Sequence, residues 1–274
     1  MKKRHAFTLV ELLVVIAIIA LLMSILVPAL RLARDQAYRA VCSNNIRDIV
    51  LGFMLYGDDY DNRLPSGGAE GNWPWDMTRN TSRRLLKYMG VDTSLYSAAP
   101  AAGGVAAAGS GGYGGGSGGD IPVQPVFFCP ANIQQKRTRE CNWGYPGTQY
   151  RVLGYAFLWA TSWNGNGNND IFGPDRKPDI SKQWVKSMAV KQPANTELVV
   201  DATLSNNDDS TFTRITCGGI DQCSSVDSTN HAYSETKPVG GNIGFVDGHM
   251  EWRPFKEMYV RWPTQINACP HFWW

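Results

Sequence analysis

Four acidic and histidine side chains in the last third of the chain are the residue types that hold metal ions or carry protons in hydrolases. They are Asp201, His231, Asp247 and His249. Their local patterns favour structural roles, because Asp247 lies in a turn signal, His249 begins an expected strand and Asp201 ends one. The His-Glu-x-x-His motif of metalloproteases is absent. We therefore expect no catalytic site and no enzyme activity, with a membrane-anchored enzyme as the alternative that metal analysis and mutation of the histidines would test.

A second group of polar residues has the spacing of a calcium-binding loop. Oxygen ligands recur at Asn164, Asn166, Asn168, Asp170 and Asp175. The glycine at the sharp turn and the terminal glutamate of such loops are missing. A solvated loop rich in Asn and Gly explains the same residues, so both interpretations stay open. We expect no other cofactor.

Cysteine chemistry is the third candidate. The six cysteines are Cys42, Cys129, Cys141, Cys217, Cys223 and Cys269. None forms a Cys-x-x-Cys pair, so the spacing typical of zinc sites is absent. In an exported domain, disulfides are the default expectation. Pairs Cys217–Cys223 and Cys129–Cys141 would close short loops and leave Cys42 with Cys269, although six cysteines allow many other connectivities.

One carboxylate, Glu11, stands near the start of an almost unbroken apolar run. Between Phe7 and Val27 the only other polar residues are Thr8 and Ser24. A helix of this length spans roughly 30 Å, the thickness of the hydrocarbon layer. The basic residues before it predict a cytoplasmic amino terminus, with the chain after Val27 outside the cytoplasm. A charge in lipid is costly, so Glu11 needs a physical reason.

Three interpretations compete for this segment. A secretory signal has a shorter apolar core and a small-x-small cleavage site. A plain signal anchor would let Glu11 reach the headgroups. A cut after Ala6 explains more, because it gives Phe7 a free amine and leaves Glu11 in the first helical turn, where the helix dipole favours an acid. Glu11 can then pair with the amine of a neighbouring subunit and set the axial register between packed helices.

At these residues the chain resembles the type IV pilins and type II secretion pseudopilins. Lys-Arg-His-Ala, followed by Phe-Thr-Leu-Val-Glu-Leu-Leu-Val-Val-Ile-Ala-Ile-Ile, is similar to the prepilin peptidase site. The resemblance implies cleavage between Ala6 and Phe7, N-methylation of Phe7, an assembly role for Glu11, and a helix-kinking proline at Pro28. Ala6 departs from the usual glycine. Type II secretion major pseudopilins also bind calcium in a carboxy-terminal loop.

The outer part resembles the large pilin-like proteins abundant in Planctomycetes, which carry a carboxy-terminal His-x9-Asp-Gly element. The similar segments are Cys42-Ser43-Asn44-Asn45-Ile46, Phe128-Cys129-Pro130, residues 192–201 and residues 240–249. His231 is separated from Asp247 by fifteen residues rather than nine. The resemblance therefore rests on Asn-x-x-Phe-x-Asp-Gly-His and does not extend to His231.

The elements that position these residues follow from periodicity. An amphipathic helix is expected from Pro28 to about Tyr56–Tyr60, with an apolar stripe facing the outer domain; the stripe comprises Leu30, Ala33, Ala37, Val41, Ile46, Ile49, Val50 and Phe53. Strands are expected at 126–128, 152–162, 197–200, 242–246 and 249–253, with Asp247-Gly248 as a two-residue hairpin turn. The aromatic tail, residues 269–274, should be packed or at an interface.

The chain is thus expected to have an α+β, pilin-like fold. Its parts are a leader (1–6), a transmembrane and assembly helix (7–27), an amphipathic continuation (28–62) and a β-rich head (63–274) with a flexible Gly/Ala-rich insertion (97–120). The formal charge of +2, without a basic patch, predicts no nucleic-acid partner.

The resemblance implies a filament subunit with itself, prepilin peptidase, an assembly platform protein and an ATPase as partners. It would lie in the inner membrane as a precursor, then in a periplasmic or extracellular filament. A minor pilin or tip adhesin is the alternative, with tryptophans such as Trp73, Trp75, Trp143, Trp159, Trp163 and Trp184 on a binding face.

Overall fold

The computed structural model describes residues 9–65, 75–93, 121–132, 150–158, 185, 187–206, 209–212, 229–234, 236–262 and 271–274. Several expectations lie outside these residues: the processing pair Ala6 and Phe7, the 97–120 insertion, and the calcium loop with Asn164, Asn166, Asn168, Asp170 and Asp175. The described residues form a long apolar helix followed by a β-sheet-rich region. This is the expected α+β, pilin-like fold.

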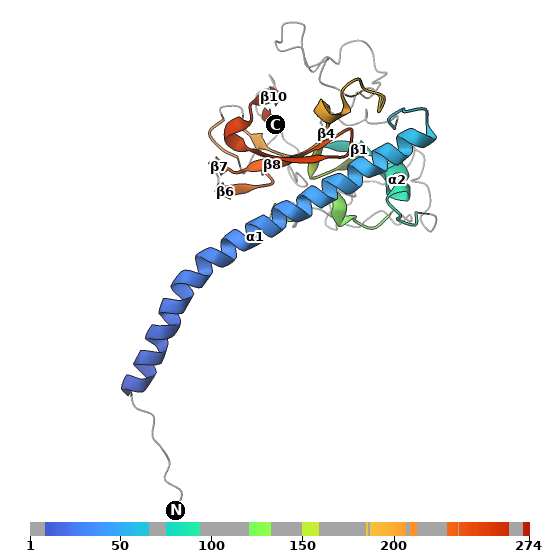
Figure 1. Ribbon diagram of the computed structural model, residues 1–274. Coiled ribbons are helices and arrows are strands. Elements are labelled where there is room, and N and C mark those ends of the chain that lie inside the picture. The colour runs from blue at the N-terminus through green and yellow to red at the C-terminus, as the bar shows by residue number, and fades with distance from the viewer. Residues whose placement is uncertain are drawn as a thin grey trace, which may run out of the picture.

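Helix α1 runs from Leu9 to Asp59 and continues through Pro28. Figure 1 shows it projecting far beyond the head as one gently curved rod. It ends where Asp61 and Asn62 take positive φ angles of 54° and 61°, and where the Asn62 N–H donates to the Gly57 carbonyl at 2.8 Å. Left-handed residues of this kind terminate helices because they redirect the chain and satisfy the last carbonyls.

Only the second half of α1 packs on the head. Its buried residues are Cys42, Ile46, Ile49, Val50, Gly52, Phe53, Tyr56 and Gly57. The expected stripe was therefore right from Ile46 to Phe53 and wrong before it, since Leu30, Ala33, Ala37 and Val41 are exposed. From Leu30 to Ala37 no described part of the head covers the helix, whereas Val41 is exposed beside buried Cys42, so there the head covers a different face of the helix from the expected one. The side chains of residues 9–37, roughly 40 Å of helix, are exposed on every face of the helix.

A four-stranded antiparallel sheet in the order β3-β4-β8-β9 forms the centre of the head. The strands are β3 (Tyr155–Phe157), β4 (Glu197–Asp201), β8 (Gly240–Phe245) and β9 (Met250–Pro254). Helix α1 lies across one face of this sheet, over β8 and β4. The main core between them contains Ile46, Val50, Phe53, Val199 and Phe157, all buried.

The other face of the sheet is covered by a second apolar cluster, including Val200, Ile243, Phe245, Phe272 and Trp274. A second sheet, β10-β11-β5, supplies part of it, with β5 at Leu204–Ser205, β10 at Val260–Trp262 and β11 at His271–Trp273. Phe272 and Trp274 are almost fully buried. The aromatic tail is packed, as expected, because its rings close the open face of the sheet.

Glycine allows the close approach of α1 to β8. A Cβ placed on Gly244 would lie 2.7 Å from Ile46 Cγ2 and 2.9 Å from Val50 Cγ2, well inside van der Waals contact. Both of these side chains are fully buried. Gly244 is therefore the position in β8 at which the helix comes closest to the sheet.

Smaller elements complete the described chain. Strands β1 (Asp76–Thr78) and β2 (Tyr150–Val152) pair with each other, as do β6 (Ala232–Ser234) and β7 (Lys237–Pro238). Helix α2 (Arg79–Tyr88) packs beside α1. The short 3-10 helices are η1 (Pro125–Phe127), η3 (Pro193–Asn195) and η4 (Phe255–Glu257).

Three local expectations were wrong. The strand expected at 152–162 is interrupted at Leu153 and Gly154, between β2 and β3, and ends at Phe157 within the described residues. The expected strand at 126–128 is the 3-10 turn η1 followed by extended Phe128, because Pro125 at its start fixes a helical φ. The β8–β9 turn is longer than two residues. Gly248 N–H donates to the Phe245 carbonyl, and among the turn residues Gly248 has the positive φ, +88°. This is a type I turn closed by a left-handed glycine, so Asp247 keeps an ordinary conformation.

Candidate functional site

A disulfide joins α1 to the segment after η1. Cys42 and Cys129 are bonded with their Cα atoms 5.4 Å apart, and both are buried. The pairings Cys42–Cys269 and Cys129–Cys141 inferred from loop length are therefore wrong. Packing of η1 against α1, rather than proximity in sequence, selects the partner. Cys141, Cys217, Cys223 and Cys269 lie outside the described residues.

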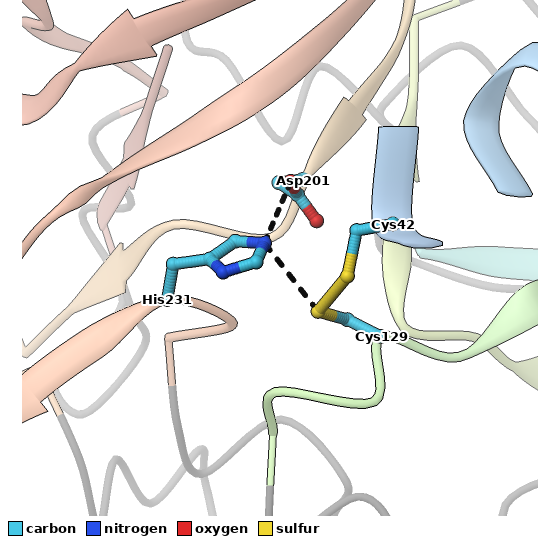
Figure 2. Close-up of side chains that lie close together, drawn as sticks. All are labelled: Cys42, Cys129, Asp201 and His231. Atoms are coloured by element: carbon cyan, nitrogen blue, oxygen red, sulfur yellow. Dashed lines mark hydrogen bonds and ion pairs between the residues drawn. A yellow bond between two sulfur atoms is a disulfide. The ribbon is translucent and has the colours of Figure 1, made fainter. Parts of the chain in front are cut away.

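Beside the disulfide lies a buried acid–histidine pair (Figure 2). Asp201 is the last residue of β4, and His231 lies immediately before β6. His231 Nε2 is 3.2 Å from Asp201 Oδ2, and their side chains are 5% and 0% exposed. The same Nε2 is 3.5 Å from Cys129 Sγ. The fold thus brings together Asp201 and His231, two of the four residues whose types suggested a metal or hydrolase site, and leaves Asp247 and His249 apart from them.

The Asp201 carboxylate is held by two asparagines. Asn242 donates to Oδ2 through its backbone N–H at 2.7 Å and its side-chain amide at 2.8 Å, and Asn230 Nδ2 donates to Oδ1 at 2.9 Å. Burial alone would raise the pKa of this carboxyl group. Electrostatic attraction to His231 and the hydrogen bonds that the carboxylate accepts outweigh the effect of burial. Together they hold the pKa of Asp201 below its ordinary value. Asp201 is therefore a stable buried anion.

Trp252 packs against His231 and carries the Arg39 guanidinium on its ring. Trp252 from β9 meets the imidazole edge-on, with ring centroids 5.2 Å apart, and the Arg39 guanidinium of α1 lies 4.2 Å above the Trp252 ring. Asn242 also donates to the Arg39 carbonyl at 3.3 Å. Side chains of α1, β4, β8 and β9 thus meet at this point, which ties the helix to the sheet by polar as well as apolar contacts.

The second predicted pair, Asp247 and His249, lies elsewhere on the surface. His249 Nδ1 is 2.6 Å from Asp247 Oδ1 at the β8–β9 turn, with 43% and 32% of the side chains exposed. Slight burial raises the pKa of Asp247, but hydrogen bonds from the His249 ring and backbone lower it further than burial raises it. His249 also stacks on Phe245 at 4.1 Å. These contacts fit the expected role in stabilising a turn.

The buried cluster does not have the layout of a nucleophile–histidine–acid triad. In such triads one imidazole nitrogen faces the acid and the other faces the nucleophile. Here Nε2 faces both Asp201 and a sulfur that is already in a disulfide. Among the described residues, this arrangement favours a structural role over proton transfer to a substrate.

The cluster of Cys42, Cys129, Asp201 and His231 could not be predicted from the sequence, because its members lie far apart along the chain. The segments that resemble the large pilin-like proteins do contain Cys42, Cys129 and Asp201, but nothing in that pattern says that they touch. Of the six tryptophans considered for a binding face, Trp75 is described. It is 2% exposed and stacks on Phe272 at 4.7 Å, so it belongs to the core.

The amino-terminal assembly residues lie on the exposed half of α1. Glu11 is in its first turn, and the Ser24 hydroxyl donates to the Leu21 carbonyl of the same helix at 2.7 Å. Large apolar side chains around them are open to the surroundings, such as Leu9 (80% exposed) and Ile25 (68%). By length and composition this helix is able to cross a membrane.

Comparison with known proteins gives one match. Residues 1–27 match the family described as the prokaryotic N-terminal methylation motif. No curated protein and no solved structure matches the chain. The matched part covers about a tenth of the sequence and supports a pilin or pseudopilin subunit that is anchored in the membrane as a precursor. Families with this motif are structural rather than catalytic.

Proposed function

We propose that this chain is a structural subunit of a type IV pilus-like or type II secretion pseudopilus filament. Prepilin peptidase would cut between Ala6 and Phe7 and methylate the new amine of Phe7. The match of residues 1–27 to the N-terminal methylation motif supports this processing. An assembly ATPase and a platform protein would then move the subunit from the inner membrane into a periplasmic or extracellular filament.

The observation that carries the proposal is the contrast between the two halves of α1. The half that follows Arg39 is fixed to the head by a disulfide and a continuous core. The half before it exposes apolar side chains on every face, for example Leu21 (65%) and Leu26 (55%). Such a surface is stable in lipid or against other apolar helices, and not in water. A filament subunit would place this helix in lipid before assembly and against the helices of other subunits afterwards.

Pro28 and Glu11 have distinct roles in this proposal. Pro28 has no N–H to donate within α1, so it weakens the helix at the end of the apolar run and allows bending there. Glu11 supplies a carboxylate in the first turn, where the free amine of Phe7 from a neighbouring subunit can reach it. The ion pair would set the axial position of one helix against the next.

Processing is tested by mass spectrometry of the chain co-produced with a prepilin peptidase. The expected mature amino terminus is N-methyl-Phe7. The control is the same chain with an inactive peptidase, which should keep its leader. An intact Met1 with active peptidase, or a cut near Ala29, would refute the proposal.

Assembly is tested with Glu11→Ala and Glu11→Val in sheared filament preparations. Both variants should fold and reach the membrane but be lost from filaments. Ser24→Ala is the matched control, because it removes a polar group from the same apolar run whose hydroxyl is satisfied within its own helix. Filaments of normal amount and composition from the Glu11 variants would disprove the register argument.

We also propose that the chain is one of the large pilin-like proteins with a His-x9-Asp-Gly element and that, contrary to the expectation from spacing, His231 is its histidine. The six extra residues before Asp247 are accounted for by the β6–β7 hairpin, which is closed by Val239 N–H donating to the His231 carbonyl at 2.8 Å. Deleting Tyr233–Pro238 restores the spacing of nine. This deletion should leave the head folded, as measured by its denaturation midpoint, whereas collapse of the fold would contradict the assignment.

A further inference from the structure

Four potential metal ligands from four separate parts of the chain converge at the buried site (Figure 2). Cys42 comes from α1, Cys129 from the segment after η1, Asp201 from β4 and His231 from the approach to β6. One ligand atom from each lies within 4.8 Å of the others, and all four residues are buried. Two sulfurs, one imidazole nitrogen and one carboxylate oxygen form a donor set that suits zinc.

Two of the ligand–ligand distances fit a tetrahedral ion. In a tetrahedron the distance between ligands is roughly 1.6 times the bond length, so zinc bonds of about 2.0–2.3 Å place nitrogen and oxygen about 3.3 Å apart and nitrogen and sulfur about 3.5 Å apart. His231 Nε2 lies 3.2 Å from Asp201 Oδ2 and 3.5 Å from Cys129 Sγ. These two edges therefore need almost no adjustment. The two sulfurs would have to separate to about 3.8 Å, which requires the disulfide to be reduced.

The position of His231 also favours a metal ion at this site. Nε2 carries either one proton or one lone pair, so it makes one good hydrogen bond at a time. Here it faces an anionic oxygen and a sulfur together. A cation between the three atoms would satisfy all of them, because each contributes a lone pair to the same centre.

The surroundings also suit a metal site. Carboxylates and imidazoles that bind metals are usually oriented by further hydrogen bonds and packing. Asn230 and Asn242 fix the Asp201 carboxylate, and Trp252 packs against the His231 ring. These neighbours orient Asp201 and His231 through contacts that do not involve the sulfur–sulfur bond.

We propose that the reduced protein binds one zinc ion through Cys42, Cys129, Asp201 and His231, and that the Cys42–Cys129 disulfide is the oxidised, metal-free state of the same site. In the conversion, a small-molecule disulfide accepts two electrons from the two zinc-bound thiolates and two protons from water, and becomes two thiols. The two zinc–sulfur bonds break, the sulfur–sulfur bond forms, and Zn²⁺ leaves. In either state α1 stays cross-linked to the head. The filament assembly proposed above does not itself require this cross-link.

The test uses the full chain in detergent micelles. The protein is reduced with a phosphine in the presence of a chelator, the chelator is removed, and Co²⁺ is added as a spectroscopic probe. We expect one cobalt per chain, with the visible bands of a tetrahedral ion and a thiolate-to-cobalt charge-transfer band. Zinc should displace it, and the oxidised protein should bind none.

Variants separate this site from the four other cysteines. Replacing Cys141, Cys217, Cys223 and Cys269 by serine should leave cobalt binding intact. His231→Asn and Asp201→Asn should each weaken it by about tenfold or more, because each removes a direct ligand. His249→Asn is the matched control at an exposed histidine outside the cluster and should bind as the unchanged chain does.

The state of the reduced protein is followed by near-ultraviolet circular dichroism. If reduction unfolds the head, zinc should restore the native signal, because metal binding and folding are then coupled. A reduced, folded protein without cobalt binding overturns the proposal. So does cobalt binding that the His231 and Asp201 variants leave unchanged, or a reduced head that zinc fails to refold.

Discussion

Replacing Gly244 by alanine tests how α1 is seated on the sheet. The added Cβ would lie 2.7 Å from Ile46 Cγ2 and 2.9 Å from Val50 Cγ2. Carbon atoms in comfortable contact are about 3.5–4.0 Å apart, so the helix and β8 would have to separate by about 1 Å. Ile46 and Val50 are fully buried and β-branched, so neither has another rotamer to adopt at low cost.

The expected cost follows from this geometry. Overpacking a well-packed core by one carbon costs about 1–3 kcal/mol. The equilibrium constant for unfolding the head should rise by roughly five-fold to more than a hundred-fold. Because the same contact holds the helix on the sheet, the loss of stability should appear in the head and not in the exposed half of α1.

The assay is urea denaturation of the full chain in micelles, followed by tryptophan fluorescence. Gly52→Ala is the matched control, since it also places a Cβ at the helix–head contact, 2.9 Å from Leu85 Cδ1. That atom is the end of a flexible side chain, and alanine in a helix interior gains about 1 kcal/mol over glycine. Gly52→Ala should therefore stay near the unchanged chain. A Gly244→Ala midpoint equal to that of the unchanged chain would refute the packing argument, and equal losses in both variants would refute its specificity.

Three further predictions concern single contacts of the head. The double variant Cys42→Ser, Cys129→Ser opens a loop of 87 residues and should lower the free energy of unfolding by about 4–5 kcal/mol, measured by urea denaturation with chelator present; an unchanged midpoint would count against the cross-link. Thr78→Ala removes the side-chain acceptor for the Thr81 N–H at the start of α2 and should cost about 1 kcal/mol, whereas Thr78→Ser should cost less, both read from the same denaturation curves. The hydrogen bond to Asp59, aided by slight burial, raises the pKa of Tyr88 to about 12, so its contribution to stability is complete below the ordinary value of 10.0 and is lost as the pH rises toward 12. In Asp59→Asn the pKa of Tyr88, followed by NMR of its ring, should fall toward 10.0; a pKa that stays near 12 would show that the carboxylate is not its cause.

Local patterns determined the amino-terminal segment and three strands of the head. The apolar run to Val27 and the Ala6–Phe7 motif depend on composition and spacing within one segment, so a membrane-length helix and a pilin-like beginning were predicted from the residues alone. The β4, β8 and β9 strands were found for the same reason, since alternation and turn residues are local signals. The turn between β8 and β9 was predicted in the right place but one residue too short, because the left-handed position falls on Gly248 alone.

Tertiary packing decided the rest. Where the buried face of α1 begins depends on how far the head extends along the helix, so Leu30 is exposed although its spacing matches the stripe. The partner of Cys42 depends on η1 lying against α1, not on loop length. The joining of Asp201 to His231 requires β4 and the approach to β6 to meet beneath the helix. Such contacts join segments separated by tens of residues, and only the folding of those segments around a shared core brings their side chains within bonding distance.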